Sequence, residues 1–306
     1  MIARLVLVTL FAAILPACVS FPDAPPKNFA PHIEDGFVVS VDGARLGLDQ
    51  WPAKNAKAAI VAVHGMNDYS AAFTYAGPYW SAHGISVFAY DQRGFGRSVD
   101  FGRWPGGDAL RQDLRAVIAA VRAQNPGLPV YVAGHSMGSS LIMTAMREAP
   151  LDVDGVILGA PGVWGGAGMS IFYRAALNIA ATFAPGKTLT GERAGRQASD
   201  NIEFLRRMYE DPLVIKATRL DAILGVERLM GEAYAASDDI RGDILMLYGE
   251  KDDIIPVGLL EKTAGRLRDT SDILVFKDGW HMIFADLERE IPLQAVADWI
   301  AADLAE

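Results

Sequence analysis

The sequence predicts an α/β fold in which a mostly parallel sheet carries helices on both faces and a helical cap is inserted between two strands. Short apolar runs, typical of strands buried on both faces, alternate along the chain with amphipathic helical segments. Such alternation predicts a parallel sheet. It stops over residues 162–240, which show helical patterns alone, and then resumes. With 51% hydrophobic residues among 306, the chain can bury a large core.

The first part of the predicted core covers residues 36–161. An Asp42-Gly43 turn between residues 36–41 and 45–51 predicts an antiparallel hairpin at its start. Apolar runs and helical periods then predict strand 58–63, helix 75–83, strand 85–90, helix 108–124, strand 129–133, helix 139–148 and strand 153–158.

The predicted cap covers residues 162–240 and the second part of the core covers residues 241–306. In the cap we expect helices only, at residues 170–183, 199–210 and 218–235. An insertion between two strands of one sheet would lie over the strand ends. The sheet then resumes with strand 244–249, helix 257–267, strand 273–276 and helix 291–304.

The amino terminus predicts export and attachment to a membrane. Residues 1–17 read as a signal peptide, since Arg4 precedes an apolar stretch from Leu5 to Leu15 that is too short to span a bilayer comfortably. Leu15-Pro16-Ala17-Cys18 resembles the lipobox of bacterial lipoproteins, although Pro16 departs from the usual small residue. Cys18 is the only cysteine, so it has no disulfide partner in the chain. An ordinary cleaved signal with an incidental cysteine is the alternative.

Residues 18–35 are expected to be a linker between the membrane and the core. Residues 21–27 are rich in proline, which favours a semi-rigid spacer. We therefore expect an exported bacterial lipoprotein that is anchored through Cys18 on the periplasmic side of the inner or outer membrane. The net charge of −9 and the lack of a basic stripe argue against a nucleic-acid partner. The sequence leaves the oligomeric state open.

The segment Gly134-His135-Ser136-Met137-Gly138 lies between a predicted strand and a predicted helix. A serine on such a sharp turn exposes its hydroxyl, and the two glycines allow neighbouring backbone to approach closely. This context predicts a nucleophile elbow with Ser136 as the nucleophile.

A serine needs a base that takes its proton and an acid that orients the base. Polar residues at the carboxyl ends of the predicted strands should converge at one edge of the sheet. These residues are His64, Asp91, Ser136, Asp252 or Asp253, and His281.

We expect His281 to be the base, because it lies in a loop between the last predicted strand and the last helix. His64 is expected to be structural, and the strand alternation should turn His135 away from the site. His32 and His83 lack a supporting context. The acid is one of two adjacent aspartates after strand 244–249, Asp252 or Asp253.

Two backbone N–H groups are needed to bind the negative oxygen that develops during ester cleavage. Met137, which follows the nucleophile, should supply one, and Met66 in the turn His64-Gly65-Met66 should supply the other. The two methionine side chains are candidates for lining an acyl pocket instead.

Several motifs together resemble the monoacylglycerol lipase and lysophospholipase group of serine hydrolases with the α/β-hydrolase fold. The resemblance runs from about Gly36 to the carboxyl terminus, and its motifs are residues 64–70, 91–98, 134–138, 249–252, 199–201 and 211–213. It implies hydrolysis of single-chain lipid esters through an acyl-serine, with no cofactor and no metal. It also implies the triad order Ser136, Asp252, His281 and places the acid three residues beyond the strand-ending glycine. Asp91 and Arg93 would brace a loop.

Two questions remain open at the level of sequence. The apolar stripe Ile171, Phe172, Ile179 and Phe183 either contacts an acyl chain or packs against the core of the cap. The alternatives to a lipid esterase are a small-ester or carbon–carbon-bond hydrolase, and a non-catalytic lipoprotein that binds a ligand on the same scaffold.

Overall fold

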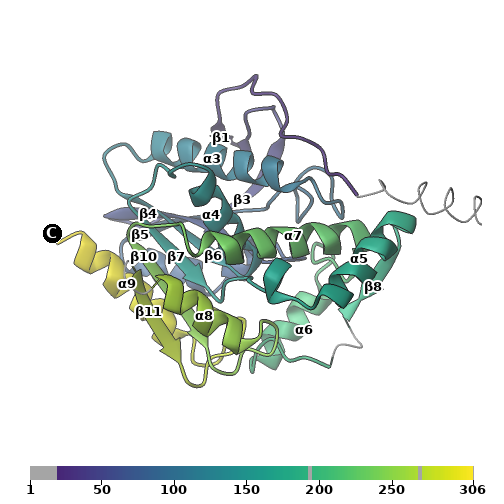
Figure 1. The fold of residues 1–306 in the computed structure, drawn as a ribbon. Coiled ribbons are helices and arrows are strands. Elements are labelled where there is room, and N and C mark those ends of the chain that lie inside the picture. The colour runs from purple at the N-terminus through teal and green to yellow at the C-terminus, as the bar shows by residue number, and fades with distance from the viewer. Residues whose placement is uncertain (1–18, 192–194, 268–270, 306) are drawn as a thin grey trace, which may run out of the picture.

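The computed structural model describes residues 19–191, 195–267 and 271–305. Within these residues a central sheet of nine strands runs through the molecule, as Figure 1 shows. The predicted fold class is confirmed. Across the sheet the strands are β1 (His32–Glu34), β2 (Phe37–Val39), β3 (Arg45–Trp51), β5 (Ile85–Tyr90), β4 (Ala58–Val63), β6 (Val130–His135), β7 (Gly155–Gly159), β10 (Ile244–Gly249) and β11 (Ser271–Phe276).

The sheet is antiparallel at one edge and parallel elsewhere. In this sheet β5, β4, β6, β7, β10 and β11 pair in parallel. Strands β1, β2 and β3 pair antiparallel, and β3 joins β5 antiparallel. The predicted hairpin is confirmed, with Phe37 opposite Gly47 and Val39 opposite Arg45. Its turn contains Gly43 at a φ of 86°, a conformation that glycine adopts without steric cost. The short strand β1 was not predicted.

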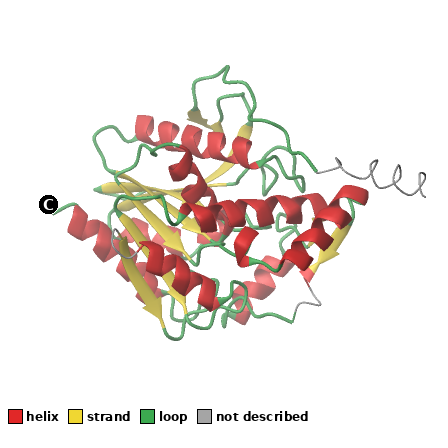
Figure 2. Cartoon of the chain, in the orientation of Figure 1, coloured by secondary structure: helices red, strands yellow, loops and turns green. Residues whose placement is uncertain are grey.

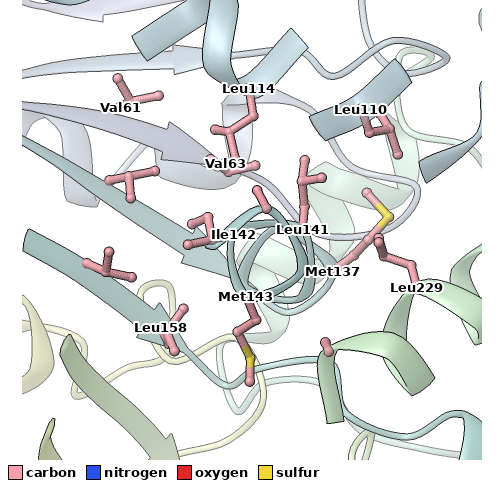
Figure 3. Close-up of a cluster of buried hydrophobic side chains, with 14 of the residues drawn as sticks. Val61, Val63, Leu110, Leu114, Met137, Leu141, Ile142, Met143, Leu158 and Leu229 are labelled. Carbon is pink, nitrogen blue, oxygen red and sulfur yellow. The ribbon is translucent and has the colours of Figure 1, made fainter. Parts of the chain in front are cut away.

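Helices cover both faces of the sheet (Figure 2). On β4, Ala59, Val61 and Val63 pack into one apolar cluster, and the intervening residues pack into another. The first cluster includes side chains of α3 (Gly107–Gln124), α4 (Met137–Glu148) and α8 (Val257–Leu267). The second includes side chains of α2 (Ala76–Ala82) and α9 (Glu290–Asp303). Figure 3 shows α4 end-on within the first cluster. This two-sided burial explains why β4 is apolar at every position.

The cap, residues 162–240, lies between β7 and β10. Its helices are α5 (Ile171–Phe183), α6 (Ile202–Glu210) and α7 (Leu220–Ala236), with a short 3₁₀ turn, η2 (Gly166–Gly168), before them. It also contains β8 (Thr188–Thr190) and β9 (Ala217–Arg219), which pair antiparallel. The expectation of helices alone is therefore wrong, because strands of three residues are too short to show an alternating pattern.

Helix α6 begins at Ile202 rather than at residue 199. The Asn201 side chain accepts a hydrogen bond from the N–H of Phe204 and so caps the helix. Outside the cap, the 3₁₀ turn η1 (Ser70–Phe73) was not predicted either. In the part of the chain that the structure describes, no helix combines the length and apolar character needed to cross a membrane.

Candidate active site

Ser136 sits on a strained turn between β6 and α4. Its φ of 52° and ψ of −116° lie in a region that residues with a side chain rarely adopt. Its N–H donates to the Gly159 carbonyl at 2.9 Å. A methyl group on Gly138 would lie 2.0 Å from the Val63 carbonyl oxygen, and one on Gly134 would lie 2.5 Å from the backbone nitrogen of Ser139. Both glycines are therefore required for the turn to pack against the sheet.

Asp252 and His281 form a buried hydrogen-bonded pair. His281 Nδ1 lies 2.8 Å from Asp252 Oδ2, and both side chains are buried. The other oxygen of Asp252 accepts from the N–H groups of Ile254 and Ile255, each at 2.8 Å. Burial alone would raise the pKa of Asp252, but the His281 ring and these N–H groups outweigh it, so the pKa is lowered.

Asp253 points elsewhere. It is exposed, and its carboxylate accepts from the N–H of Gln197 in the cap. The structure therefore pairs His281 with the first of the two adjacent aspartates.

The loop that carries His281 is held by side chains that sequence reasoning did not assign to the site. His135 Nε2 lies 2.9 Å from the His281 carbonyl oxygen. Because a carbonyl can only accept, this nitrogen carries the proton; burial lowers the pKa of His135 to about 3, so its ring is neutral. The N–H of Trp280, the residue before His281, donates to Asp286 Oδ2 at 2.8 Å. Ser199 Oγ donates to Asp286 Oδ1 at 2.5 Å.

Ser199 belongs to the cap, so this pair of hydrogen bonds ties the cap to the His281 loop. Burial raises the pKa of Asp286 to about 6. The segment 199–201 was the only sequence signal for this connection, and nothing in the sequence marked Asp286.

His64 stiffens the turn that follows β4. Its Nδ1 donates to the Gly65 carbonyl at 2.8 Å, and its Nε2 accepts from the Gln92 N–H at 2.9 Å. The Gln92 side chain also donates to the His64 carbonyl at 2.7 Å. Burial lowers the pKa of His64 to about 4, so the ring is neutral. A methyl group on Gly65 would lie 3.3 Å from the Ser136 Cβ, so this turn lies directly against the serine.

The two expected N–H donors are the residues that directly follow Gly65 and Ser136 in the chain. Met66 follows Gly65, and Met137 is the first residue of α4, where an N–H has no acceptor within the helix. The Met137 side chain is 1% exposed and packs near Leu229 in the core (Figure 3). The elbow directs it into the core, and it is absent from the lining of the cavity described below. Met66 is partly buried against the same cluster.

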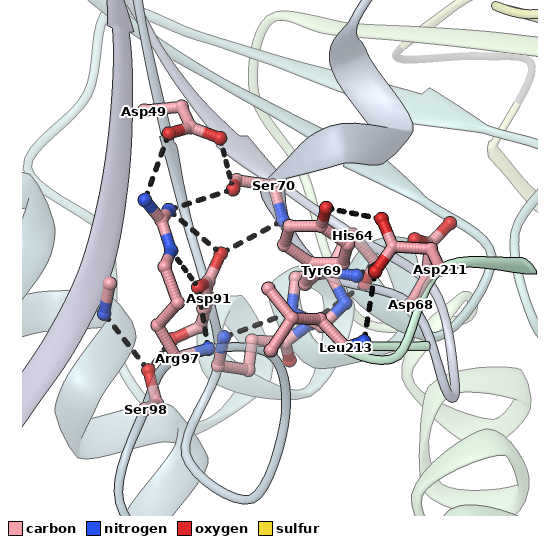
Figure 4. Close-up of polar contacts among 12 residues, drawn as sticks. Asp49, His64, Asp68, Tyr69, Ser70, Asp91, Arg97, Ser98, Asp211 and Leu213 are labelled. Carbon is pink, nitrogen blue, oxygen red and sulfur yellow. Dashed lines mark hydrogen bonds and ion pairs between the residues drawn. The ribbon is translucent and has the colours of Figure 1, made fainter. Parts of the chain in front are cut away.

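Charged networks brace the neighbouring loops, as Figure 4 shows. Asp91 accepts from the N–H of Ser70 at 2.9 Å and from Arg97 Nε at 2.8 Å. Burial alone would raise its pKa, but these donors outweigh it and the pKa is lowered. Arg93 binds Asp113 through two hydrogen bonds of 2.8 and 3.0 Å. Among the residues described, no group of three metal-ligating side chains is placed to hold an ion.

The cap contacts the turn after β4 and forms an open cavity beside it. Tyr69 Oη donates to Asp211 Oδ2 at 2.6 Å (Figure 4), and Asn67 Nδ2 donates to Thr218 Oγ1 at 2.7 Å. The cavity has a volume of about 510 Å³. Among the described residues, Asn67 is its only lining residue from outside the cap. The others are Leu189, Thr190, Gly191, Leu205, Met208, Tyr209, Val214, Ile215, Lys216, Thr218 and Ile223.

The apolar stripe on α5 is exposed rather than packed against the core of the cap. Ile171, Phe172, Ile179 and Phe183 are 60–83% exposed. They are absent from the lining of this cavity and from the buried cluster between α5 and α7.

Comparisons with known proteins agree with this fold. The family model described as serine aminopeptidase, S33, matches residues 54–288. A monoacylglycerol lipase of Mycolicibacterium smegmatis is 26% identical over 281 residues, covering 86% of this chain and 95% of the relative. The crystal structure of the Paleococcus ferrophilus monoacylglycerol lipase has a TM-score of 0.72 at 22% identity, covering 84% of this chain and 99% of that one. A carboxyl esterase from Bacillus coagulans has a TM-score of 0.73 at 18% identity, covering 87% and 96%. The chain has the α/β-hydrolase fold and belongs to the family described as serine aminopeptidase, S33.

Proposed function

We propose that this protein is a serine hydrolase that cleaves carboxylic esters of single-chain lipids, monoacylglycerols or lysophospholipids, through an acyl-serine intermediate. The observation that carries the proposal is the buried Asp252–His281 pair combined with Ser136 on its strained elbow. Asp252 occupies Nδ1 of the imidazole, which leaves Nε2 to accept the serine proton. The relative from Mycolicibacterium smegmatis that is named as a monoacylglycerol lipase supports the substrate class.

The proposed reaction uses only this chain and water. Ser136 Oγ attacks the ester carbonyl and its proton moves to His281 Nε2. The negative oxygen of the tetrahedral intermediate accepts hydrogen bonds from the N–H groups of Met66 and Met137. His281 then gives the proton to the leaving alcohol as the bond to it breaks. A water molecule, deprotonated by His281, hydrolyses the acyl-serine and restores the hydroxyl.

The cavity of about 510 Å³ suits an acyl chain. Its walls are mainly aliphatic, with polar groups at Asn67, Thr190, Lys216 and Thr218. Asn67 follows the proposed donor Met66. Its Oδ1 is buried and has no hydrogen-bond partner within the described residues. An amphiphile with an apolar chain would match the walls of this cavity.

We further propose that the chain is an exported bacterial lipoprotein, anchored on the periplasmic side through Cys18. Cys18 lies outside the described residues, and the support comes from the apolar stretch Leu5–Leu15 and the lipobox-like segment. The test is fractionation together with mass spectrometry of the mature amino terminus. A Cys18→Ser chain that still sediments with membranes would remove the lipid anchor.

The test of the hydrolase proposal is labelling with a fluorophosphonate, using the full chain purified in detergent. We expect stoichiometric labelling that Ser136→Ala abolishes, while Ser170→Ala, at an exposed serine before α5, leaves it unchanged. An ester series should then show a preference for long-chain monoacylglycerols. Activity on short esters or non-ester substrates alone would favour a small-ester or carbon–carbon-bond hydrolase. An unreactive Ser136 with tight retention of a ligand would favour a binding protein.

A further inference from the structure

A single stretch of the cap, residues 196–201, contacts both loops that carry the proposed acid and base. We call this stretch the bridging segment. Its first two residues bind the acid loop: Arg196 Nη1 donates to the carbonyls of Asp253 and Ile254 at 3.1 and 2.9 Å, and the Gln197 N–H donates to Asp253 Oδ2 at 3.0 Å. The backbone that directly follows the acid is therefore attached to the cap.

The rest of the bridging segment binds the loop that carries the base. The Ala198 carbonyl accepts from the Met282 N–H at 2.9 Å. Asn201 Nδ2 donates to the Ala285 carbonyl at 2.8 Å, while its Oδ1 caps α6, so this asparagine joins the start of the helix to the loop. Because the loop takes part through backbone groups, these bonds fix the path of its main chain.

Ser199 lies inside the bridging segment and reaches the base loop through Asp286. Their side chains are buried, and the two residues are 0% and 3% exposed. Ser199 Oγ donates to Asp286 Oδ1, and Asp286 Oδ2 accepts from the Trp280 N–H. The N–H groups on either side of His281, those of Trp280 and Met282, are thus both held from the cap, one through Asp286 and one directly.

Packing alone does not account for the buried Ser199–Asp286 pair. Burial raises the pKa of Asp286 to about 6, although its hydrogen bonds to Ser199 and to the Trp280 N–H act in the opposite direction. A buried carboxyl costs folding free energy that an apolar side chain of similar size would not. What the carboxyl supplies is two acceptors with a fixed separation, one for the cap and one for the main chain beside the base.

We propose that Ser199 and Asp286 are positioning residues for the base: they fix the main chain beside His281 and so hold its Nε2 at the hydroxyl of Ser136. The proposal rests on the proposed hydrolase function. It makes the cap a part of the catalytic arrangement rather than a cover over it. A displacement of the bridging segment would then slow the chemistry even though the acid, base and nucleophile are all intact.

The experiment compares Ser199→Ala with Ser170→Ala in the full chain purified in detergent. Ser170 is the matched control, because it is an exposed serine of the cap whose side chain makes no capping hydrogen bond. A fluorophosphonate counts the reactive sites and gives the rate at which each is labelled, and p-nitrophenyl butyrate gives kcat and KM for each counted site.

We expect Ser199→Ala to lower kcat at each counted site by roughly 10- to 100-fold, the size of loss that a shift of about 1 Å in a reacting group causes. KM should stay within about twofold, since the lost interaction acts only during the chemical step. The labelling rate should fall together with kcat, while the final amount of label stays stoichiometric. Ser170→Ala should match the parent in all of these values.

A second pair of variants tests whether the hydrogen bonds of Asp286 do the positioning. In Asp286→Asn the amide oxygen accepts from the Trp280 N–H and the NH₂ group donates to Ser199 Oγ, so both links remain. Asp286→Ala removes both. We expect Asp286→Asn to be at least about tenfold faster in kcat than Asp286→Ala.

Labelling of the parent and of Ser199→Ala at the same rate would overturn the proposal. So would fewer counted sites with an unchanged kcat at each, because the bridging segment would then only stabilise the fold. Equal kcat values for Asp286→Asn and Asp286→Ala would overturn it as well. A parent chain that the fluorophosphonate does not label refutes the hydrolase function itself, so the two failures are distinguishable.

Discussion

Asp252→Asn tests the site most sharply, because the change is isosteric and the structure fixes its consequence. In the native side chain, Oδ1 accepts from the N–H groups of Ile254 and Ile255, and Oδ2 holds His281 Nδ1. An asparagine keeps its oxygen toward the two N–H donors, since its NH₂ group would oppose them. The NH₂ group then faces His281 Nδ1, which must accept. The imidazole proton moves to Nε2, so the ring can no longer take the proton of Ser136.

The expected loss in kcat is about 10⁴-fold, the size of the effect when this change forces the wrong tautomer in a serine protease. At 1.36 kcal/mol for each factor of ten, this corresponds to roughly 5 kcal/mol of transition-state stabilisation. The fold should persist. The lowered pKa of Asp252 means that the folded state favours its charged form. At neutral pH the variant therefore loses only the part of the folding stability that comes from this charge.

The assay is steady-state hydrolysis of p-nitrophenyl butyrate, with circular dichroism to confirm folding. Asp253→Asn is the matched control, because this side chain is exposed and contacts the Gln197 N–H rather than the base. We expect it to stay within about threefold of the parent, as surface changes usually do. If Asp252→Asn keeps more than a tenth of the parent kcat, the tautomer argument is refuted. A large loss in Asp253→Asn alone would transfer the role of the acid.

Three further predictions concern stability. Gly138→Ala should destabilise the fold by about 3 kcal/mol or more, because its new methyl group meets a carbonyl oxygen at 2.0 Å. The control Gly258→Ala on α8 meets nothing within 4 Å and should be neutral or slightly stabilising. Urea unfolding curves measure both changes in stability. Burial raises the pKa of Asp68 to about 7, so the folded state binds its proton more tightly than the unfolded chain, and stability falls as the pH rises from about 4 to 7. Asp68→Asn should flatten that fall in unfolding curves taken across this range, and an unchanged slope would contradict it. His135→Phe leaves the His281 carbonyl without its buried donor and should cost about 1–3 kcal/mol together with a loss in kcat, so an unchanged Tm and kcat would refute the bracing role.

The core strands were predictable because burial on both faces leaves a continuous apolar run in the local sequence. Residues 58–63 and 85–90 are apolar at every position, and each lies buried between two layers of helices. The elbow around Ser136 was also predictable, since a strand, two glycines and a helix follow one another without a gap. Backbone geometry at such a turn is a local property, and short sequence patterns report it.

The choice between Asp252 and Asp253 could not be made from residue types alone. The family resemblance favoured Asp252, and the structure shows why. One carboxylate is buried against His281 and the other faces solvent, a difference set by how the loop after β10 meets the loop after β11. The bracing role of His135, which the strand alternation was expected to turn away from the site, and that of Asp286 were not predicted for a related reason, because their partners are 146 and 87 residues away along the chain.

The sequence by itself determined the order of the strands and helices of the core apart from the short strand β1, the hairpin at Asp42-Gly43 and the nucleophile elbow, because periodicity and turn chemistry depend on neighbouring residues. Only the tertiary structure decided which aspartate meets the histidine and which side chains hold its loop. It also showed that the apolar stripe of α5 is uncovered: a helical period reveals that one face is apolar, but what packs against that face depends on distant parts of the chain.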